Sequence, residues 1–418
     1  MRKCLVVAYY FPPMGLSGVQ RILKFVKYLR EYNWEPIVLT TSSKDYYAYD
    51  ESLSNELESL GIEVYRTNDG KEVSKKNNFL PNYSKQKFGR FFLNFFNIPD
   101  SKIKWKKFAL SKAERIFKEH KIEVILATAP PFTDFLIAKE LSEKYNLPYL
   151  LDYRDSWIDN KFHYFPTPYH KSKAIALETE FMRTSSRVIV ISRQAKENLI
   201  KRYKFLSYDD IVIIPHGYDQ DDLDAVAHIK PDNSYFTVTH SGVFQDDRTP
   251  KYFFKAIRNI IKSNPEIKKH LRVRLVGLMR KNHIKLITKY KLDEIITSVG
   301  FVNHKESVNY LMNSDVLWLM LNDDIRTPGK LWEYFGVKKP ILATIPDGPM
   351  KKLCLEYKAS IVTKPKDIAE IEKAILEYYN LWKSNTLPKA DENFVEQFDR
   401  KALTEILAKQ LSLAISIN

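Results

Sequence analysis

"VVAYYFPPMGLSGVQR", residues 6–21, joins an apolar run to two prolines, two glycines and the start of an amphipathic segment. The apolar run predicts a buried strand, and the segment that follows predicts a helix with one apolar face, formed by Val19, Ile22, Leu23, Val26 and Leu29. Glycine-bearing turns between a strand and a helix commonly hold phosphate, because free backbone N–H groups point out of the helix start. The spacing of Gly15 and Gly18 matches neither a dinucleotide fingerprint nor a P-loop, so a plain tight turn is the alternative.

The same alternation of strand and helix continues along the chain. Strands are expected in the first half at residues 3–10, 35–41, 62–67, 123–129, 147–155, 187–192 and 211–219. In the second half they are expected at residues 235–242, 271–277, 295–302, 315–321, 339–345 and 359–363. Short apolar strands separated by helices predict parallel sheets covered by helices on both faces.

The length of 418 residues favours two domains. We therefore predict an α/β protein with two doubly wound, Rossmann-like domains that face each other across a cleft. The N-terminal domain is expected to span 1–210 and the C-terminal domain 211–394, with a final helix at about 395–418 that packs back on the first domain. Ligands of open parallel sheets bind at the carboxyl ends of the strands, so the cleft is the expected site.

The net charge of +15 is unevenly spread. Residues 71–121 hold 14 Lys and Arg against 4 Asp and Glu. Within residues 85–121, basic side chains alternate with the rings of Phe91, Phe92, Phe95, Phe96 and Trp105. This pattern predicts an interfacial surface for an anionic membrane, and a core-packing helix with a solvated basic face is the alternative. No nucleic-acid-binding motif accompanies the charge, so no nucleic acid partner is expected.

The two cysteines, Cys4 and Cys354, lie far apart in apolar surroundings. This usage is typical of a reducing cytoplasm and argues against a disulfide framework. No apolar run approaches the roughly 20 residues that span a bilayer. A cytoplasmic protein, peripheral at the inner face of the plasma membrane, is the expected localisation.

The first candidate site in the second half is "NDDIRTPGKLWEYFGVKKPILA", residues 322–343. Pro328 and Gly329 follow a strand and open a helix, a position at which proline loses nothing. Free backbone donors from Gly329 to Leu331, together with the Lys330 ammonium, would meet a diphosphate. Glu333, one turn further on, could accept hydrogen bonds from a ribose diol. The alternative is an ordinary exposed Lys–Glu pair.

Two further loops carry candidate residues. Gly242 ends the strand at 235–242, and Arg248 lies just before the next helix, where its guanidinium is suited to bidentate phosphate contact. In "LLDYRDSW", residues 150–157, the charged residues Asp152, Arg154 and Asp155 cluster at a strand end and predict a polar recognition site. A structural Asp–Arg pair would explain these charges as well.

Together these segments resemble the retaining, nucleotide-sugar-dependent glycosyltransferases of family 4, of the type found in bacterial polysaccharide synthesis, which have the GT-B fold. The resemblance rests on "YYFPPMGLSGVQR", "ATAPPFTDFLIAKEL", "LLDYRDSW", "IPHGYD", "SGVFQDDR" and "TPGKLWEYFGVKKPILA", in that order along the chain. It implies a donor site in the C-terminal domain, with Arg248 and Lys330 on the diphosphate as catalytic groups. Asp155 or Arg154 occupies the place where many relatives carry a histidine near the reacting sugar.

The resemblance also implies contacts of Gly242, Pro328, Gly329, Leu331 and Glu333 with the donor, and of Gly15, Gly18, Asp152 and Arg154 with phosphate or acceptor. The chain departs from the family pattern at further positions, among them Thr249, which lies near the place of a usual lysine. Ile325 stands where relatives often have a second glutamate, so the donor sugar stays open, and Val243 replaces the usual arginine after the glycine of the diphosphate turn.

The implied reaction moves a sugar from a nucleoside-diphosphate sugar to a hydroxyl of a lipid-linked glycan, with retention. No cofactor is expected, and no metal, because cations already face the diphosphate. Two other classes stay open: a nucleotide-sugar epimerase of the same fold, and a non-catalytic nucleotide-sugar binder.

Overall fold

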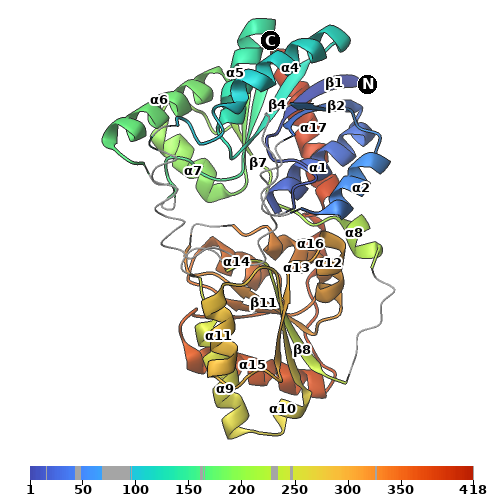
Figure 1. The fold of residues 1–418 in the computed structure, drawn as a ribbon, viewed down its shortest axis with the longest axis vertical. Helices are drawn as coiled ribbons and strands as arrows, with labels where there is room; N and C mark the ends of the chain where they lie inside the picture. Colours follow the sequence, from blue (N-terminus) through green and yellow to red (C-terminus); the bar gives the residue numbers. More distant parts are fainter. Residues whose placement is uncertain are drawn as a thin grey trace. The chain divides into compact units, whose positions relative to one another are not determined.

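The computed structural model describes residues 1–15, 17–42, 49–67, 95, 97–160, 163, 165–226, 234–244, 248–324 and 327–417. These residues form two compact units. The N-terminal unit runs to His216 and resumes at Arg400, whereas the C-terminal unit runs from Gly217 to Asp399. Each unit is a parallel sheet covered by helices (Figure 1).

The sheet of the N-terminal unit has seven strands in the order β3-β2-β1-β4-β5-β6-β7. Its strands are β1 (Arg2–Val7), β2 (Trp34–Thr41), β3 (Val64–Thr67), β4 (Val124–Ala129), β5 (Tyr149–Tyr153), β6 (Arg187–Val190) and β7 (Ile211–Ile213). The helices are α1 (Ser17–Leu29), α2 (Glu51–Ser59), α4 (Trp105–Glu119), α5 (Thr133–Tyr145), α6 (Pro168–Thr184), α7 (Arg193–Arg202) and α17 (Arg400–Ile417), with a 3₁₀ turn at Arg30–Tyr32. Every residue of β4 and β5 is buried, as a sheet covered on both faces requires.

The sheet of the C-terminal unit has six strands in the order β10-β9-β8-β11-β12-β13. Its strands are β8 (Phe236–Ser241), β9 (Leu271–Val276), β10 (Ile296–Gly300), β11 (Val316–Met320), β12 (Ile341–Thr344) and β13 (Ser360–Thr363). The helices are α8 (Gln220–Asp224), α9 (Lys251–Ser263), α10 (Ile267–His270), α11 (Lys281–Lys289), α12 (His304–Met312), α13 (Lys330–Val337), α14 (Pro349–Glu356), α15 (Ile368–Lys383) and α16 (Glu392–Glu396). Both sheets are parallel throughout, so the prediction of two doubly wound, Rossmann-like domains is confirmed.

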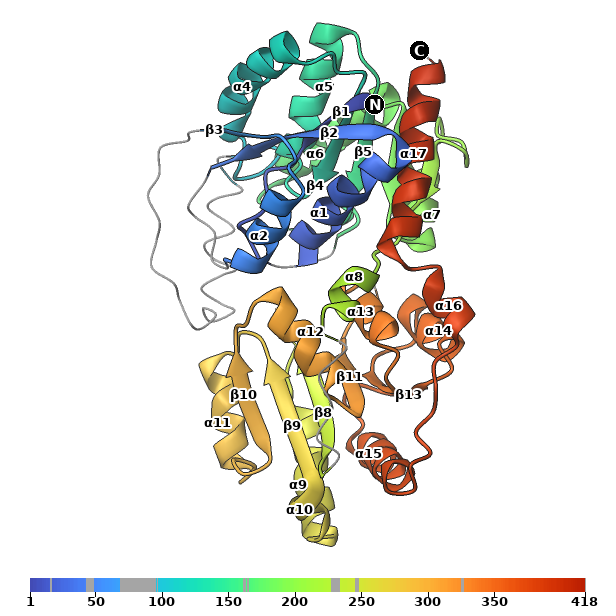
Figure 2. The ribbon, with the colours of Figure 1, turned by 90° about the vertical axis from the view of Figure 1, so that its right-hand side faces the viewer.

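The boundary between the units lies later than the sequence suggested. The expected division between residues 210 and 211 would cut β7 from its sheet, but Val188 of β6 pairs with Ile211 of β7. The physical reason is that this short strand completes the edge of the first sheet. The final helix, α17, lies beside α1 (Figure 2) and buries Leu403, Leu407, Leu411 and Ala414 in the core of the N-terminal unit.

Most of the basic aromatic stretch lies outside the described residues, including Phe91, Phe92 and Phe96. Trp105 opens α4, but its ring is 3% exposed and its indole N–H donates to the Thr67 hydroxyl over 2.9 Å. The expectation that this ring is available for lipid is therefore wrong, because the ring fills the core under β3. Phe95 and Phe108 are exposed. No helix among the described residues is both long and apolar enough to cross a bilayer.

Candidate active site

The Lys330 side chain begins the candidate donor site in the C-terminal unit. Helix α13 starts at Lys330. The Nζ ammonium of Lys330 donates to Nε2 of His240 over 3.2 Å. The other ring nitrogen, Nδ1, lies 2.9 Å from the backbone oxygen of Trp318. A carbonyl can only accept, so Nδ1 carries the proton and Nε2 is left as the acceptor for Lys330. His240 at the end of β8 is thus a neutral, buried support for the lysine.

Burial and positive neighbours set the charge state of this cluster. Burial, and then the charges of Lys330 and Arg248, hold the pKa of His240 well below its ordinary value. Burial also lowers the pKa of Lys330, with a further lowering from Arg248 and an opposing influence from Glu333. Arg248 is itself only 7% exposed. Two cations held together in a low-dielectric site favour a ligand of high negative charge.

Gly242 makes room for the Lys330 side chain. Its φ of +120° suits glycine, and a Cβ at this position would lie 3.3 Å from Cδ and 3.4 Å from Nζ of Lys330. Its N–H donates to the carbonyl of Val276 over 2.8 Å, which ties the ends of β8 and β9 together. The structure therefore places Gly242, Arg248 and Lys330 in one cluster at the carboxyl end of β8, as the sequence predicted for the diphosphate turn.

The start of α13 differs in one detail from the expectation. The Leu331 side chain is fully buried, and its N–H donates to the carbonyl of Pro328 over 3.0 Å. The predicted free donor at Leu331 is therefore wrong, because the first turn of the helix already uses it. Pro328 and Gly329 precede the helix as expected, and the carbonyl of Gly329 accepts from Trp332.

Glu333 lies on α13 beside an imidazole that the sequence did not single out. Its Oε1 is 3.9 Å from Nδ1 of His304, and Nε2 of His304 is 3.0 Å from Oδ2 of Asp222. His304 opens α12, and its side chain is 10% exposed. The imidazole is hydrogen-bonded to Asp222 of α8 and lies beside the Glu333 carboxylate, which is placed one turn from Lys330.

We expect His304→Asn to weaken the binding of a nucleotide sugar while leaving turnover at saturation nearly unchanged. The variant removes the hydrogen bond to Asp222, and a hydrogen bond to a charged group contributes about 1.5–3 kcal/mol. If about 1.4 kcal/mol of this is lost from donor binding because the surroundings of Glu333 are less ordered, KM for the donor rises about 10-fold. Steady-state kinetics check this, with His304→Gln as the partial rescue, because its longer side chain carries an amide N–H closer to the position of Nε2 and to Asp222. A fall in kcat at constant KM would contradict the assignment of His304 as a positioning residue.

In the N-terminal unit, the partner of Asp152 is Arg21 and not Arg154, which lies two positions away in the sequence. Arg21 of α1 donates to Asp152 through Nε at 3.1 Å and Nη2 at 2.8 Å, and the Thr128 hydroxyl donates over 2.8 Å. The Asp152 side chain is fully buried. The prediction that Asp152 contacts substrate is therefore replaced by the structural alternative: β5 uses this carboxylate to anchor α1.

Arg154 anchors the opening turn instead. Its Nη1 donates to the carbonyl of Gly18 over 2.7 Å, and its Nη2 donates to the carbonyl of Pro130. A Cβ at Gly18 would lie 2.5 Å from Nη1, so the glycine allows the guanidinium to approach α1. Burial lowers the pKa of Arg154 from its ordinary value. The guanidinium, which lies just after β5, thus joins the start of α1 with the loop that follows β4.

The other predicted site residues of the N-terminal unit are Asp155 and Gly15. Asp155 is exposed, and its charge favours the protonated form of Arg154. Gly15 is buried next to Met14, which forms an isolated bridge with Tyr49. His216, from the motif that ends this unit, is buried, and burial holds its pKa well below the ordinary value. Asp155 is the exposed carboxylate of the "LLDYRDSW" group.

Comparison with protein-family models identifies the class of protein to which the chain belongs. Two family models match the chain: Glycosyltransferase Family 4 over residues 18–222, and Glycosyl transferases group 1 over residues 221–397. The chain therefore belongs to the glycosyltransferases of the family 4 type, whose fold is GT-B, and it is a transferase. A search of curated proteins finds no match.

Solved structures share the fold over nearly the full chain. Sucrose-phosphate synthase from Thermosynechococcus elongatus is 13% identical, with a TM-score of 0.70 and complete coverage of both chains. HepE from Anabaena in complex with UDP is 14% identical, with a TM-score of 0.65 and coverage of 99% of this chain and 100% of that one. A putative UDP-N-acetylglucosamine 2-epimerase from Listeria monocytogenes is 13% identical, with a TM-score of 0.57 and coverage of 99% and 95%. Because an epimerase shares the fold, the fold alone does not separate the two activities, and the family models carry the assignment.

Proposed function

We propose that this glycosyltransferase moves a hexose from a nucleoside-diphosphate hexose, of which UDP-hexose is the first to test, to a lipid-linked glycan during cell-surface polysaccharide synthesis. The observation that carries the donor assignment is the cluster of Lys330, His240, Gly242 and Arg248 at the end of β8. Neighbouring structures with this fold support the choice of nucleotide, since HepE has been solved with UDP and with UDP-glucose.

The cluster suits the charge that develops during transfer. Breaking the bond between the anomeric carbon and the diphosphate builds negative charge on the leaving group, and preorganised cations stabilise that charge most in a site that excludes water. Lys330 and Arg248 would take this role, and Glu333 would accept from the ribose hydroxyls. Asp155, as an exposed carboxylate, is proposed to act on the reacting sugar or the acceptor hydroxyl. Retention of configuration is part of the proposal and is read from the anomeric signals of the product by NMR.

One assay tests the proposal. The protein is incubated with a panel of nucleotide sugars, with and without lipid-linked glycan acceptors, while release of nucleoside diphosphate and product mass are followed together. We expect release that depends on the acceptor, together with a glycosylated product. Tight nucleotide binding without release for any donor would favour the non-catalytic binder, and a changed donor sugar without acceptor would favour the epimerase.

The donor affinity should fall as pH rises. A bound diphosphate favours the charged form of Lys330, so the pKa of this lysine is higher in the complex than in the free protein, where burial lowers it. Between these two values the complex holds a proton that the free protein lacks, and binding takes up that proton. Calorimetry of nucleotide-sugar binding in two buffers of different ionisation enthalpy should show this uptake, and Lys330→Ala should abolish it. Proton release, or uptake unchanged in Lys330→Ala, would contradict the assignment.

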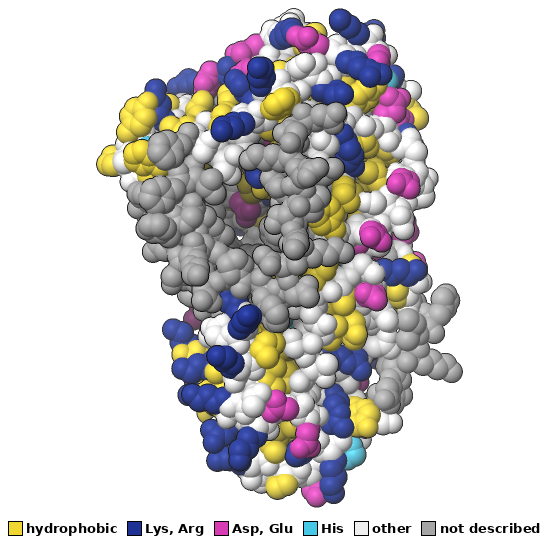
Figure 3. Space-filling model, viewed as in Figure 1, with side chains coloured by type: hydrophobic (Ala, Val, Ile, Leu, Met, Phe, Trp, Pro, Cys, Tyr) yellow, Lys and Arg dark blue, Asp and Glu magenta, His cyan; other side chains and the backbone are white. Residues whose placement is uncertain are grey.

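A peripheral membrane attachment through α4 belongs to the same proposal. Among the four lysines of residues 102–107, Lys102 lies over the Tyr9 ring and Lys106 donates to Glu140, whereas Lys104 and Lys107 are exposed near Phe108. Lys and Arg side chains also gather over α9 and α11 of the C-terminal unit (Figure 3). A test of membrane binding must therefore distinguish the lysines near α4 from the basic side chains over α9 and α11.

We expect Lys104→Gln with Lys107→Gln to weaken binding to vesicles that contain phosphatidylglycerol about 30-fold. A lysine near an anionic surface contributes about 1 kcal/mol, so two contribute about 2 kcal/mol. Vesicle sedimentation measures the bound fraction, with phosphatidylcholine vesicles as the uncharged reference. The matched control is Lys285→Gln with Lys289→Gln on α11, both exposed. A larger loss in the control pair would place the docking surface on α11 instead.

A further inference from the structure

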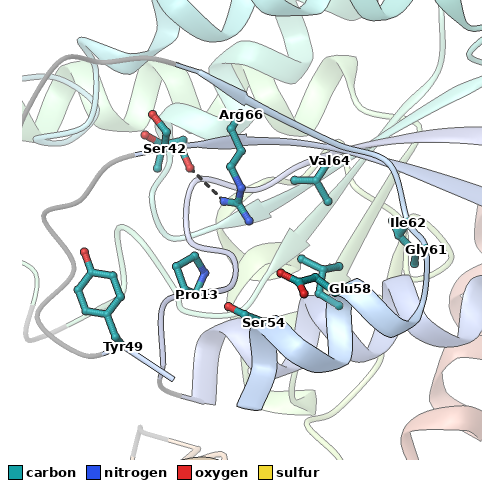
Figure 4. Close-up of a pocket in the computed structure, with 11 residues that line it drawn as sticks. Pro13, Ser42, Tyr49, Ser54, Glu58, Gly61, Ile62, Val64 and Arg66 are labelled. Carbon is teal, nitrogen blue, oxygen red and sulfur yellow. Dashed lines mark hydrogen bonds between the residues drawn. The ribbon is translucent and has the colours of Figure 1, made fainter. Parts of the chain in front are cut away.

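A pocket of about 580 Å³ lies within the N-terminal unit, and none of the residues considered above as donor contacts lines it. Its walls come from the loop after β1, the carboxyl end of β2, helix α2 and strand β3 (Figure 4). β3 is the edge strand of the sheet. The volume falls in the range of small-molecule sites, and carboxyl ends of parallel strands are where such sheets bind ligands.

One part of the pocket wall is polar and carries both signs of charge. Arg66 extends from β3 toward the centre of the lining residues, with Glu58 and Ser54 on α2 and Ser42 after β2 (Figure 4). Nη2 of Arg66 donates to the carbonyl of Pro12 over 2.6 Å, and Nη1 donates to the carbonyl of Thr41 over 3.4 Å, so the plane of the guanidinium is fixed by two backbone contacts. A carboxylate accepts from ligand hydroxyls, a guanidinium brings N–H donors and positive charge, and a serine hydroxyl both donates and accepts.

The other part of the pocket wall is apolar. It is formed by the ring of Pro13, the ring of Tyr49 and the side chains of Ile62 and Val64. Apolar surface of this kind packs on the C–H face of a pyranose ring, whose hydroxyls then point to the polar wall. A ligand with hydroxyls around its edge and apolar faces matches both walls.

Other classes of ligand fit this lining less well. The helix start of α2 is capped by Asp50, whose carboxylate accepts from the N–H of Ser52 over 3.0 Å, so this end already has an anion. Glu58 opposes a strongly anionic ligand such as a nucleoside diphosphate. The hydroxyls and charges of the wall disfavour the acyl or prenyl part of a lipid, because burying them against hydrocarbon is costly.

We propose that this pocket binds an uncharged hexopyranose of the acceptor glycan. The role in the reaction rests on the proposed transferase function, whereas the binding of the sugar does not. The pocket is tied to the opening loop, because the carbonyl of Pro13 accepts from the N–H of Asp50 over 2.9 Å and that of Pro12 accepts from Arg66. The loop that leads to Gly15 and Gly18 therefore forms one wall of the acceptor pocket.

The test uses simple sugars as probes, since they need no lipid. Methyl glycosides of glucose, galactose, mannose and N-acetylglucosamine are titrated against the full chain, and binding is followed by saturation-transfer NMR. Ser54→Trp fills the pocket, and Arg66→Gln removes the charged donors while keeping a polar side chain. The matched control is Asn55→Trp, an exposed neighbour on the same helix that does not line the pocket. Thermal unfolding shows that each variant is folded.

We expect at least one glycoside to bind the wild type and Asn55→Trp equally, to lose binding in Ser54→Trp and to bind about 10-fold more weakly to Arg66→Gln. No binding of any glycoside, or equal binding to both tryptophan variants, would overturn the proposal. Displacement of the glycoside by UDP or by a prenyl phosphate would overturn it as well. Nucleotide-sugar binding is measured separately in the same variants, so failure of the donor assignment is distinguished from failure of the pocket.

Discussion

Lys330→Ala should reduce kcat/KM for sugar transfer about 10²–10³-fold, the loss that follows removal of one preorganised donor to a developing negative charge. The structure gives the reason. The Lys330 ammonium donates to neutral His240, and the absence of a side chain at Gly242 leaves room for it. The charge of Arg248 also acts on this ammonium. Its position is therefore fixed before the donor arrives, and alanine leaves the leaving diphosphate with one cation fewer.

The measurement is initial-rate kinetics with the best donor and acceptor of the panel. Lys285→Ala, an exposed lysine on α11, is the matched control and should keep wild-type rates. Thermal unfolding separates loss of activity from loss of the fold, and removal of a lysine whose pKa burial lowers should not destabilise the C-terminal unit. A Lys330→Ala protein with full activity would place the diphosphate elsewhere.

Asp152→Ala should destabilise the N-terminal unit by about 3–5 kcal/mol, because it leaves the guanidinium of Arg21 buried without its counter-charge. The pair is almost inaccessible to solvent, with 3% and 0% of the two side chains exposed. Arg21 would keep its hydrogen bonds to the carbonyls of Ile214 and Pro215, which do not neutralise it. Hydrogen exchange of β4 and β5 during urea titration, read by mass spectrometry, measures the change within this unit.

The double variant Arg21→Met with Asp152→Leu is the control for this prediction. It removes both charges, and replacement of a buried pair by apolar side chains is often close to neutral. Exchange in β8 and β11 should be unchanged in both proteins, because these strands belong to the other unit. A stable Asp152→Ala protein with a raised KM for acceptor would restore the substrate-binding role.

Patterns along the chain were sufficient to predict the sheets and the local motifs. The alternation of short apolar strands and amphipathic helices depends on neighbours in sequence, so it is visible without the fold. The same holds for the helix at "TPGKLWEYF", in which proline and glycine mark the start and Lys330 and Glu333 lie one turn apart. Gly242 was found because it ends a strand.

Pairings across the fold could not be predicted in this way. His240 is one of several polar residues in an apolar strand, and only the approach of α13 from 90 positions further along makes it a support for Lys330. Arg21 and Asp152 are separated by 131 positions, so the sequence alone does not identify Arg21 as the partner of Asp152. Trp105 looked like a membrane anchor because its neighbours are lysines, but burial depends on β3. His304 had no distinguishing neighbours at all.

Helix α17 has a consequence for how the protein is made. Its leucines complete the core of the N-terminal unit, whose last strand, β7, ends at Ile213. The ribosome must therefore finish residues 400–417 before that core can be fully packed. The described residues of the C-terminal unit lie in one stretch, Gly217–Asp399, which is synthesised before α17. Domains usually mature in the order of their synthesis. For this chain we expect the reverse order, with the N-terminal unit reaching its native state after the C-terminal unit.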